Sequence, residues 1–153
     1  MANYENKLTL EAWNAVAERG RGSLLQSATV GQNTPYVNFD LSDINWDDYS
    51  FVGVWVKIPG TLTPSIHCVL MDAEERWPSL REDICDVSGN SVLMVFLPLR
   101  NASRTACTIL VSGAANYRTS AFRFEEVIGM QISTSGSGSY ISTGTVIEIW
   151  GVR

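Results

Sequence analysis

The sequence predicts an all-β protein, an antiparallel sandwich or barrel of about eight to nine strands. From residue 24 onward, short runs rich in β-branched and aromatic residues are separated by turn residues at regular intervals. Hydrophobic and polar residues alternate in several of these runs, as in strands with one buried face. No strand–helix–strand rhythm is present, which excludes a doubly wound parallel sheet. With 45% hydrophobic and 18% charged residues in a chain of 153, a folded domain is expected.

The first part of the chain differs from the rest. Residues 1–22 are predicted to form an N-terminal arm or helix, and residues 23–153 a single β-sandwich domain. A helical pattern over residues 9–19 places Trp13 on an apolar face. An edge strand over residues 7–10 is the alternative.

Strands alternate with turns and loops along the remainder of the chain. The expected strands cover residues 24–30, 36–41, 50–58, 65–71, 91–99, 105–112, 121–126, 127–133 and 145–152, with 121–126 and 127–133 forming one bent strand or two. The expected loops cover residues 42–49, 72–86, 113–120 and 133–142. In the strand over residues 50–58, Val52, Val54 and Val56 share one face. Gly144 permits the turn before the last strand, and Gly151 permits a close approach or a bulge.

Charge and hydropathy exclude two classes of partner. The 11 basic and 16 acidic residues give a net charge of −5, which argues against sequence-independent binding to nucleic acid. Residues 1–7 are polar, so no secretory signal is expected and the protein is made in the cytoplasm. The longest apolar run, residues 91–99, is shorter than the roughly 20 residues that span a bilayer. Neither nucleic-acid binding nor membrane insertion is expected.

The residues that usually perform catalysis or hold metals are sparse. Cys68, Cys85 and Cys107 form no C-x-x-C pair, which argues against a zinc site. Cys68 and Cys107 lie in apolar runs and are expected to be buried and reduced. The single histidine, His67, precedes Cys68 on a strand, so the two side chains point to opposite faces and cannot act as a pair. No catalytic residue, metal or cofactor is predicted.

The acidic residues suggest two further kinds of site, a glycosidase carboxyl pair and a calcium loop, and the sequence supports both only weakly. The adjacent pairs are Asp47–Asp48, Glu74–Glu75 and Glu125–Glu126. Neighbours on an extended strand point apart, whereas a glycosidase needs two facing carboxyl groups. A calcium loop formed by Asp40, Asp43, Asp47 and Asp48 lacks the spacing of an EF-hand. Solvated loop charge is the favoured interpretation of both groups.

Aromatic residues are more suggestive, since five tryptophans are present. Four aromatic residues fall in expected loops and are the candidates for ligand binding: Trp46, Trp77, Tyr117 and Tyr140. Exposed loop aromatics can stack on sugar rings or fill a partner's pocket. The alternative is that each closes one end of the core. Phe51 and Trp55, which share one face of a strand, and Trp13 are the candidates for contacts between subunits.

Three segments resemble structural proteins of bacteriophages. Residues 124–132 and 141–153, which end the chain as GTVIEIWGVR, resemble the closing strands common in phage virion and tail proteins. Residues 44–55 resemble a strand entry of the same proteins. The resemblance implies a jelly-roll β-sandwich of the kind found in receptor-binding and head-appendage proteins, which often form trimers and often bind cell-surface glycans.

These observations lead to one main functional hypothesis. The chain is expected to be a non-enzymatic phage virion protein of a tail or head appendage, located in the virion. Its expected partners are copies of itself, most often as a trimer, other virion proteins and a bacterial surface glycan. Residues 91–120 and 131–147 contain no acidic residue, as expected for surfaces buried against neighbours. The alternatives are a stand-alone carbohydrate-binding module and a glycan-active β-sandwich hydrolase.

Overall fold

The chain forms an antiparallel β-structure in the computed structural model. The structure describes residues 22–59, 66–71, 79–82, 91–97, 105–111, 114–120, 126–134 and 138–153. The described elements are β1 (Gly22–Thr29), β2 (Tyr36–Asp40), the 3₁₀ helix η3 (Trp46–Asp48), β3 (Phe51–Lys57), β4 (Ile66–Met71), β5 (Ser79–Glu82), β6 (Ser91–Leu97), β7 (Thr105–Val111), β8 (Ala114–Ser120), β9 (Gly129–Thr134) and β10 (Val146–Val152). None of the described segments contains a helix long and apolar enough to cross a membrane.

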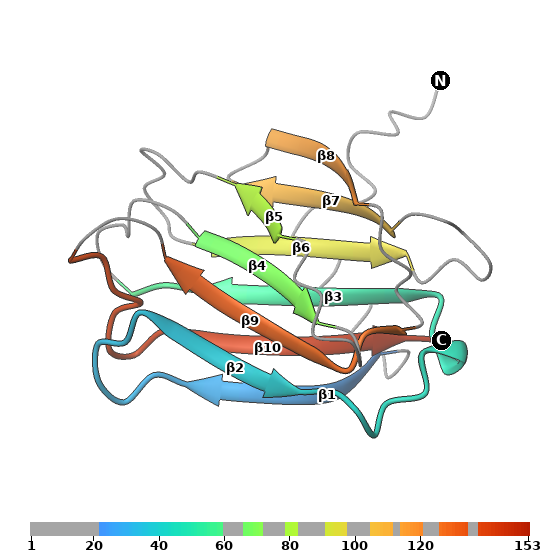
Figure 1. Ribbon diagram of the computed structural model, residues 1–153, viewed down its shortest axis with the longest axis horizontal. Helices are drawn as coiled ribbons and strands as arrows, with labels where there is room; N and C mark the ends of the chain where they lie inside the picture. Colours follow the sequence, from blue (N-terminus) through green and yellow to red (C-terminus); the bar gives the residue numbers. More distant parts are fainter. Residues whose placement is uncertain are drawn as a thin grey trace.

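The strands form two sheets that pack face to face. The larger sheet has the order β1-β10-β3-β6-β7-β8, and the smaller has the order β2-β9-β4-β5. Every pair of neighbouring strands is antiparallel. The strands of the smaller sheet cross over those of the larger sheet, so the two layers are plainly separate (Figure 1). The chain passes repeatedly from one layer to the other, as in a jelly roll. The predicted all-β sandwich is therefore confirmed.

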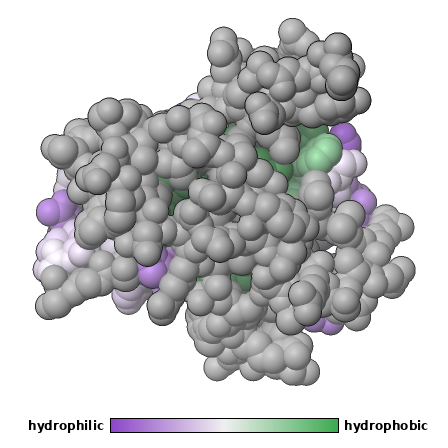
Figure 2. All heavy atoms as spheres, turned by 90° about the horizontal axis from the view of Figure 1, so that it is seen from above, coloured by the Kyte–Doolittle hydropathy of each residue, from purple (hydrophilic) through white to green (hydrophobic). Residues whose placement is uncertain are grey.

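The core lies between the two sheets and follows from the alternation in the sequence. Val52, Val54 and Val56 of β3 are fully buried, as their shared face predicts. From the smaller sheet, Ile132 of β9 and Cys68 of β4 are also fully buried, and burial of Cys68 is what the sequence predicts. Burying one such aliphatic side chain contributes about 1.5–3 kcal/mol. Seen from above, the described hydrophobic residues show only as small areas, whereas hydrophilic residues gather near the edges (Figure 2).

Two glycines have the backbone conformation or the close contact that the sequence predicts for them. Gly144 has a φ of +85° in the turn before β10, which favours glycine. Gly151 lies in β10, where a Cβ would overlap the ring of Tyr49. The close approach predicted at this position is therefore present.

Two expected loops contain strands, and those predictions were wrong. Residues 114–120, expected as part of a loop, form β8, which pairs with β7 along its whole length. Residues 79–82, expected within the loop over residues 72–86, form β5 and pair with β4. Both are edge strands without a strong hydrophobic alternation, so hydrogen bonding to a neighbour defines them more than local pattern does.

The other expected strands agree with the structure to within a few residues. The first strand begins at Gly22 and so includes the last residue assigned to the N-terminal arm. The strand expected over residues 121–126 lies outside the described residues except for Glu126, which is not in a strand. The helix expected over residues 9–19 lies outside them too.

Candidate functional site

Trp46 does not lie on the surface. It begins η3, where Asn45 caps the helix by accepting a hydrogen bond from the Asp47 amide at 3.2 Å. The Trp46 side chain is only 4% exposed, and its Nε1 donates to the Val127 carbonyl at 2.8 Å. A large apolar ring at the end of the sandwich gains more from closing the core than from solvent. The prediction that Trp46 binds a ligand is therefore wrong.

Three other candidates cannot be placed as side chains. Trp13 and Trp77 lie outside the described residues. Tyr117 lies in strand β8, not in a loop, but only its backbone is described. Their predicted roles stay predictions.

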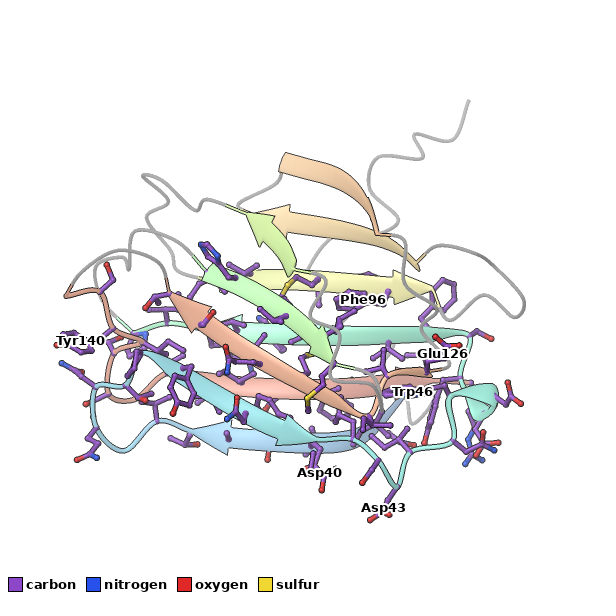
Figure 3. All side chains as sticks on the ribbon, in the orientation of Figure 1. Asp40, Asp43, Trp46, Phe96, Glu126 and Tyr140 are labelled. Carbon is purple, nitrogen blue, oxygen red and sulfur yellow. The ribbon has the colours of Figure 1, made fainter. Side chains whose placement is uncertain are left out.

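Tyr140 is an exposed aromatic, as expected. It is 49% exposed in the connection between β9 and β10, at the opposite end of the molecule from Trp46 (Figure 3). Sequence reasoning missed Tyr36, which is 50% exposed at the start of β2. The two tyrosines lie near the bridge between Thr34 and Ile141, whose backbones exchange hydrogen bonds of 3.2 and 2.7 Å. This end of the sandwich thus presents two tyrosines.

The connections next to these tyrosines are held by side-chain hydrogen bonds. Asn33 Oδ1 accepts from the Thr143 amide at 3.0 Å and from Thr143 Oγ1 at 3.2 Å. Thr134 Oγ1 donates to the Ser139 carbonyl at 3.1 Å. Tyr140 therefore projects from a connection that is held at several points.

A second group of hydrophobic residues lies on the outward side of the larger sheet. We call this group the tryptophan face; its members are Leu24, Phe51, Trp55, Leu93, Val95, Trp150 and Val152. Leu93, Val95 and Val152 are buried, whereas Leu24 is 49% and Phe51 38% exposed. The predicted subunit-contact residues Phe51 and Trp55 thus lie on one surface.

Charged groups order the tryptophans of this face. Lys57 Nζ lies 3.3 Å from Glu148 Oε2 and 3.5 Å from the centroid of the Trp55 ring. Trp150 Nε1 donates to the same Glu148 oxygen at 3.2 Å. One ion pair therefore touches both tryptophans and fixes how their rings lie on the sheet.

The outward side of the smaller sheet carries polar side chains on β2 and β9. Gln131 of β9 is opposite Asn38 of β2, and Gln131 Nε2 donates to Asn38 Oδ1 at 2.9 Å. At the end of β2, Asp40 Oδ1 accepts from Ser42 Oγ at 2.7 Å and from the Ser42 amide at 3.0 Å. These hydrogen bonds from Ser42 stabilise the charged form and hold the pKa of the exposed Asp40 below its ordinary value of 3.8.

In the part of the chain that the structure describes, the remaining titratable residues form no cluster that could hold a metal ion. His67 is 7% exposed in β4 and faces the opposite side of the strand from Cys68, as expected. Asp43, Asp47 and Asp48 are exposed. Within the described residues, no group of three or more His, Cys, Asp or Glu side chains is placed to hold a metal ion.

Comparison with known proteins supports the fold. No protein-family model and no curated protein sequence matches the chain. The structure is similar to exo-inulinase from Aspergillus awamori, with a TM-score of 0.52 and 10% identity over 85% of this chain and 29% of that one. It also resembles the Caenorhabditis elegans galectin LEC-6, with a TM-score of 0.46 and 14% identity over 86% of this chain and 98% of that one. A tetrameric galectin from the ball sponge Cinachyrella sp. has a TM-score of 0.42 and 12% identity over 78% of this chain and 99% of that one.

At these identities the comparisons concern architecture alone. The chain spans less than a third of the length of the exo-inulinase that it matches. The similarity to this enzyme agrees with the two-layered sheet arrangement. The chain is thus a β-sandwich.

Proposed function

We propose that this chain is a non-enzymatic structural protein of a bacteriophage virion, in a tail or head appendage. It assembles with copies of itself, with a trimer favoured, and attaches to glycans on the host surface. The proposal rests partly on the phage-like ending over residues 144–153, most of which forms β10 between β1 and β3.

The tryptophan face is the single observation that carries the proposal of assembly. Leu24 lies opposite Trp150, and Phe51 lies opposite Val152, so the exposed and the buried members adjoin across β1, β10 and β3. Leu24 and Phe51 are the exposed members of this apolar patch, and exposed apolar side chains that adjoin a hydrophobic cluster mark a surface that meets another protein. Copies of the chain would bury this patch, with Phe51 and Trp150 as the aromatic anchors.

The molar mass in solution tests the assembly. Sedimentation velocity at micromolar concentration should give an oligomer for the wild type. Phe51→Glu places a charge in the patch and should shift the mass to that of a monomer. Tyr140→Glu is the matched control, since Tyr140 is also exposed but lies outside the tryptophan face. A monomeric wild type would contradict the proposal.

Attachment to glycans is supported by Tyr36 and Tyr140. Tyr36 begins β2, and Tyr140 lies on a connection that is held by the hydrogen bonds from Thr143 to Asn33, so the two rings can stack on sugar rings with little loss of conformational entropy. Tyr140→Ala should weaken binding of the labelled protein to host cells several-fold, whereas Gln32→Ala in a neighbouring exposed turn should not. A wild-type monomer that binds glycans would favour the carbohydrate-binding module instead.

Two further measurements test the remaining parts. Mass spectrometry of purified particles should find the chain in the virion, and capsid, portal or tail genes should adjoin its gene. The non-enzymatic role is tested by activity. The purified protein should not hydrolyse bacterial polysaccharides. Turnover that His67→Ala abolishes would favour the hydrolase and overturn the non-enzymatic role.

A further inference from the structure

A hollow lies on the outward side of the smaller sheet, where β2 ends and β9 begins. Its volume is about 460 Å³. The polar residues at its wall are Asn38, Asp40, Ser42 and Gln131, and Met71 and Ile128 supply apolar surface. Asp40, at the wall of the hollow, lies on the same outward side of β2 as Tyr36. The two residues are four positions, or about 13 Å, apart along the strand.

Gly129 lies between residues that line the hollow, Ile128 on one side and Met130 on the other. Gly129 is paired with Asp40 on one side and with Met71 on the other. A Cβ at Gly129 would lie 2.6 Å from Met71 Cε and 3.5 Å from the Phe39 carbonyl oxygen. A side chain at this position would therefore displace the Met71 methyl group and change the wall of the hollow that Met71 forms.

The polar groups around Gly129 offer complementary hydrogen bonds. Both hydrogen bonds from Ser42 end on Asp40 Oδ1, and Oδ2 accepts none from the described part of the chain. The bond from Gln131 Nε2 to Asn38 Oδ1 leaves Asn38 Nδ2 as a donor and Gln131 Oε1 as an acceptor. The hollow therefore combines a charged acceptor, an amide donor and an amide acceptor.

The charge of the hollow selects among ligands. Its described walls carry the Asp40 carboxylate and no basic side chain, so an anionic ligand is repelled. A hydroxyl group can donate to a carboxylate and accept from an amide N–H, and a sugar ring has several. The C–H face of such a ring would pack against Met71 and Ile128.

We infer that the hollow at Gly129 binds a neutral sugar ring. The inference rests on the proposed attachment to glycans and adds to it the location of the binding site and the preference for an uncharged sugar. The sugar's hydroxyl groups donate to Asp40 and accept from Asn38, and its apolar face covers Met71. Tyr36 lies along β2 where a longer chain of sugars would continue.

Titration of the ¹⁵N-labelled full chain with simple sugars tests this inference. The probes are the methyl glycosides of glucose, galactose and mannose, N-acetylglucosamine, and glucuronate as the anionic counterpart. At least one neutral sugar should shift the amide signals of Asp40, Gly129 and Gln131, and glucuronate should bind at least tenfold more weakly. Gly129→Ala and Asp40→Asn should each raise Kd at least tenfold. Gly31→Ala is the control, because a Cβ there meets no atom within 4 Å.

The outcomes separate this inference from the proposed function. If the wild type binds sugars or host cells and both Gly129→Ala and Asp40→Asn bind equally well, the hollow is not the site, but attachment stands. If the wild type binds neither sugars nor cells, both the sugar site and the proposed attachment to glycans are wrong. Asp40 is exposed, so Asp40→Asn keeps the test valid even where Gly129→Ala disturbs Met71 and fails to fold. Loss of binding in the folded Asp40→Asn variant supports the hollow.

Discussion

Asp40 shows how one residue next to a strand end acquires its chemistry. It ends β2, and Ser42 turns back to donate both its amide and its hydroxyl to Asp40 Oδ1. The sequence contains Asp40 and Ser42 two residues apart. How the chain leaves the sheet decides that the amide and the hydroxyl of Ser42 both point at the carboxylate. This local arrangement keeps the carboxylate charged, which the proposed sugar site needs.

We predict that Ser42→Ala raises the pKa of Asp40 toward 3.8, because it removes the 2.7 Å hydrogen bond from the hydroxyl. The folded-state pKa of Asp40 is lowered, so its stabilising contribution is present above 3.8 and is lost as the pH falls through the folded-state value. An NMR titration of the Asp40 carboxyl through the acidic range measures both variants. Ser27→Ala is the control, and an unchanged pKa in Ser42→Ala would refute the assignment.

A second prediction concerns two tryptophans with different surroundings. Trp46→Phe removes the indole donor of the Val127 carbonyl and should lower the free energy of unfolding by about 1–3 kcal/mol. Trp55→Phe is the matched control, because the buried Trp55 Nε1 has no hydrogen-bond partner among the described residues. Trp55→Phe therefore removes buried ring area but no hydrogen bond. Denaturant unfolding measures both, and equal losses would contradict the role of the Trp46 bond.

At the scale of the element, β10 has two different faces. Ile147 and Ile149 point into the core, whereas Glu148 and Trp150 point outward. The strand lies between β1 and β3, so both of its edges are hydrogen-bonded. Its inward face therefore supports the fold, and its outward face belongs to the surface proposed for assembly.

We predict that substitutions on these two faces differ strongly in cost. Ile149→Ala, at a fully buried position, should lower the free energy of unfolding by about 2–5 kcal/mol. Glu148→Gln should cost less than about 1 kcal/mol, because Lys57 and Glu148 are partly exposed. A double-mutant cycle with Lys57→Met isolates the ion pair. A cost for Glu148→Gln as large as that for Ile149→Ala would show that the outward face also supports the fold.

The strands at the sheet edges show the limit of local pattern. β3 and β10 alternate clearly in the sequence, and their ranges were predicted to within a residue or so. β8 contains Ala, Asn, Arg, Thr and Ser with one aromatic residue, and no hydrophobic alternation distinguishes it from a loop. It becomes a strand because β7 offers it a hydrogen-bonding edge over its whole length. Long-range pairing, which a local window does not contain, decides such elements.

For the whole molecule, two sheets enclose one core and leave a second hydrophobic group outside. The enclosed cluster draws members from both sheets, whereas the tryptophan face lies on the larger sheet alone. Its exposed members, Leu24 and Phe51, are the reason at this scale to expect association between copies.

We predict that association makes thermal stability depend on concentration. A contact formed only by folded chains stabilises the fold by mass action, so the Tm of the wild type should rise with protein concentration. Phe51→Glu should remove this rise while leaving the Tm at low concentration nearly unchanged, because Phe51 is 38% exposed. Calorimetry over a hundredfold range of concentration measures the effect. A constant Tm for the wild type would contradict assembly through this face.

The sequence alone determined the class of the fold, most strand ranges and the inward faces of the central strands, because alternation and turn residues are local signals. It also identified Phe51, Trp55 and Tyr140 as aromatic residues worth attention. Only the tertiary structure decided which aromatics are accessible, since Trp46 is drawn into the core and Tyr36 is left outside. It alone created the hollow at Gly129, which is lined by residues 38–40, 42, 71, 128, 130 and 131. Burial and concavity depend on how distant strands pack, and no local pattern of residues encodes that contact.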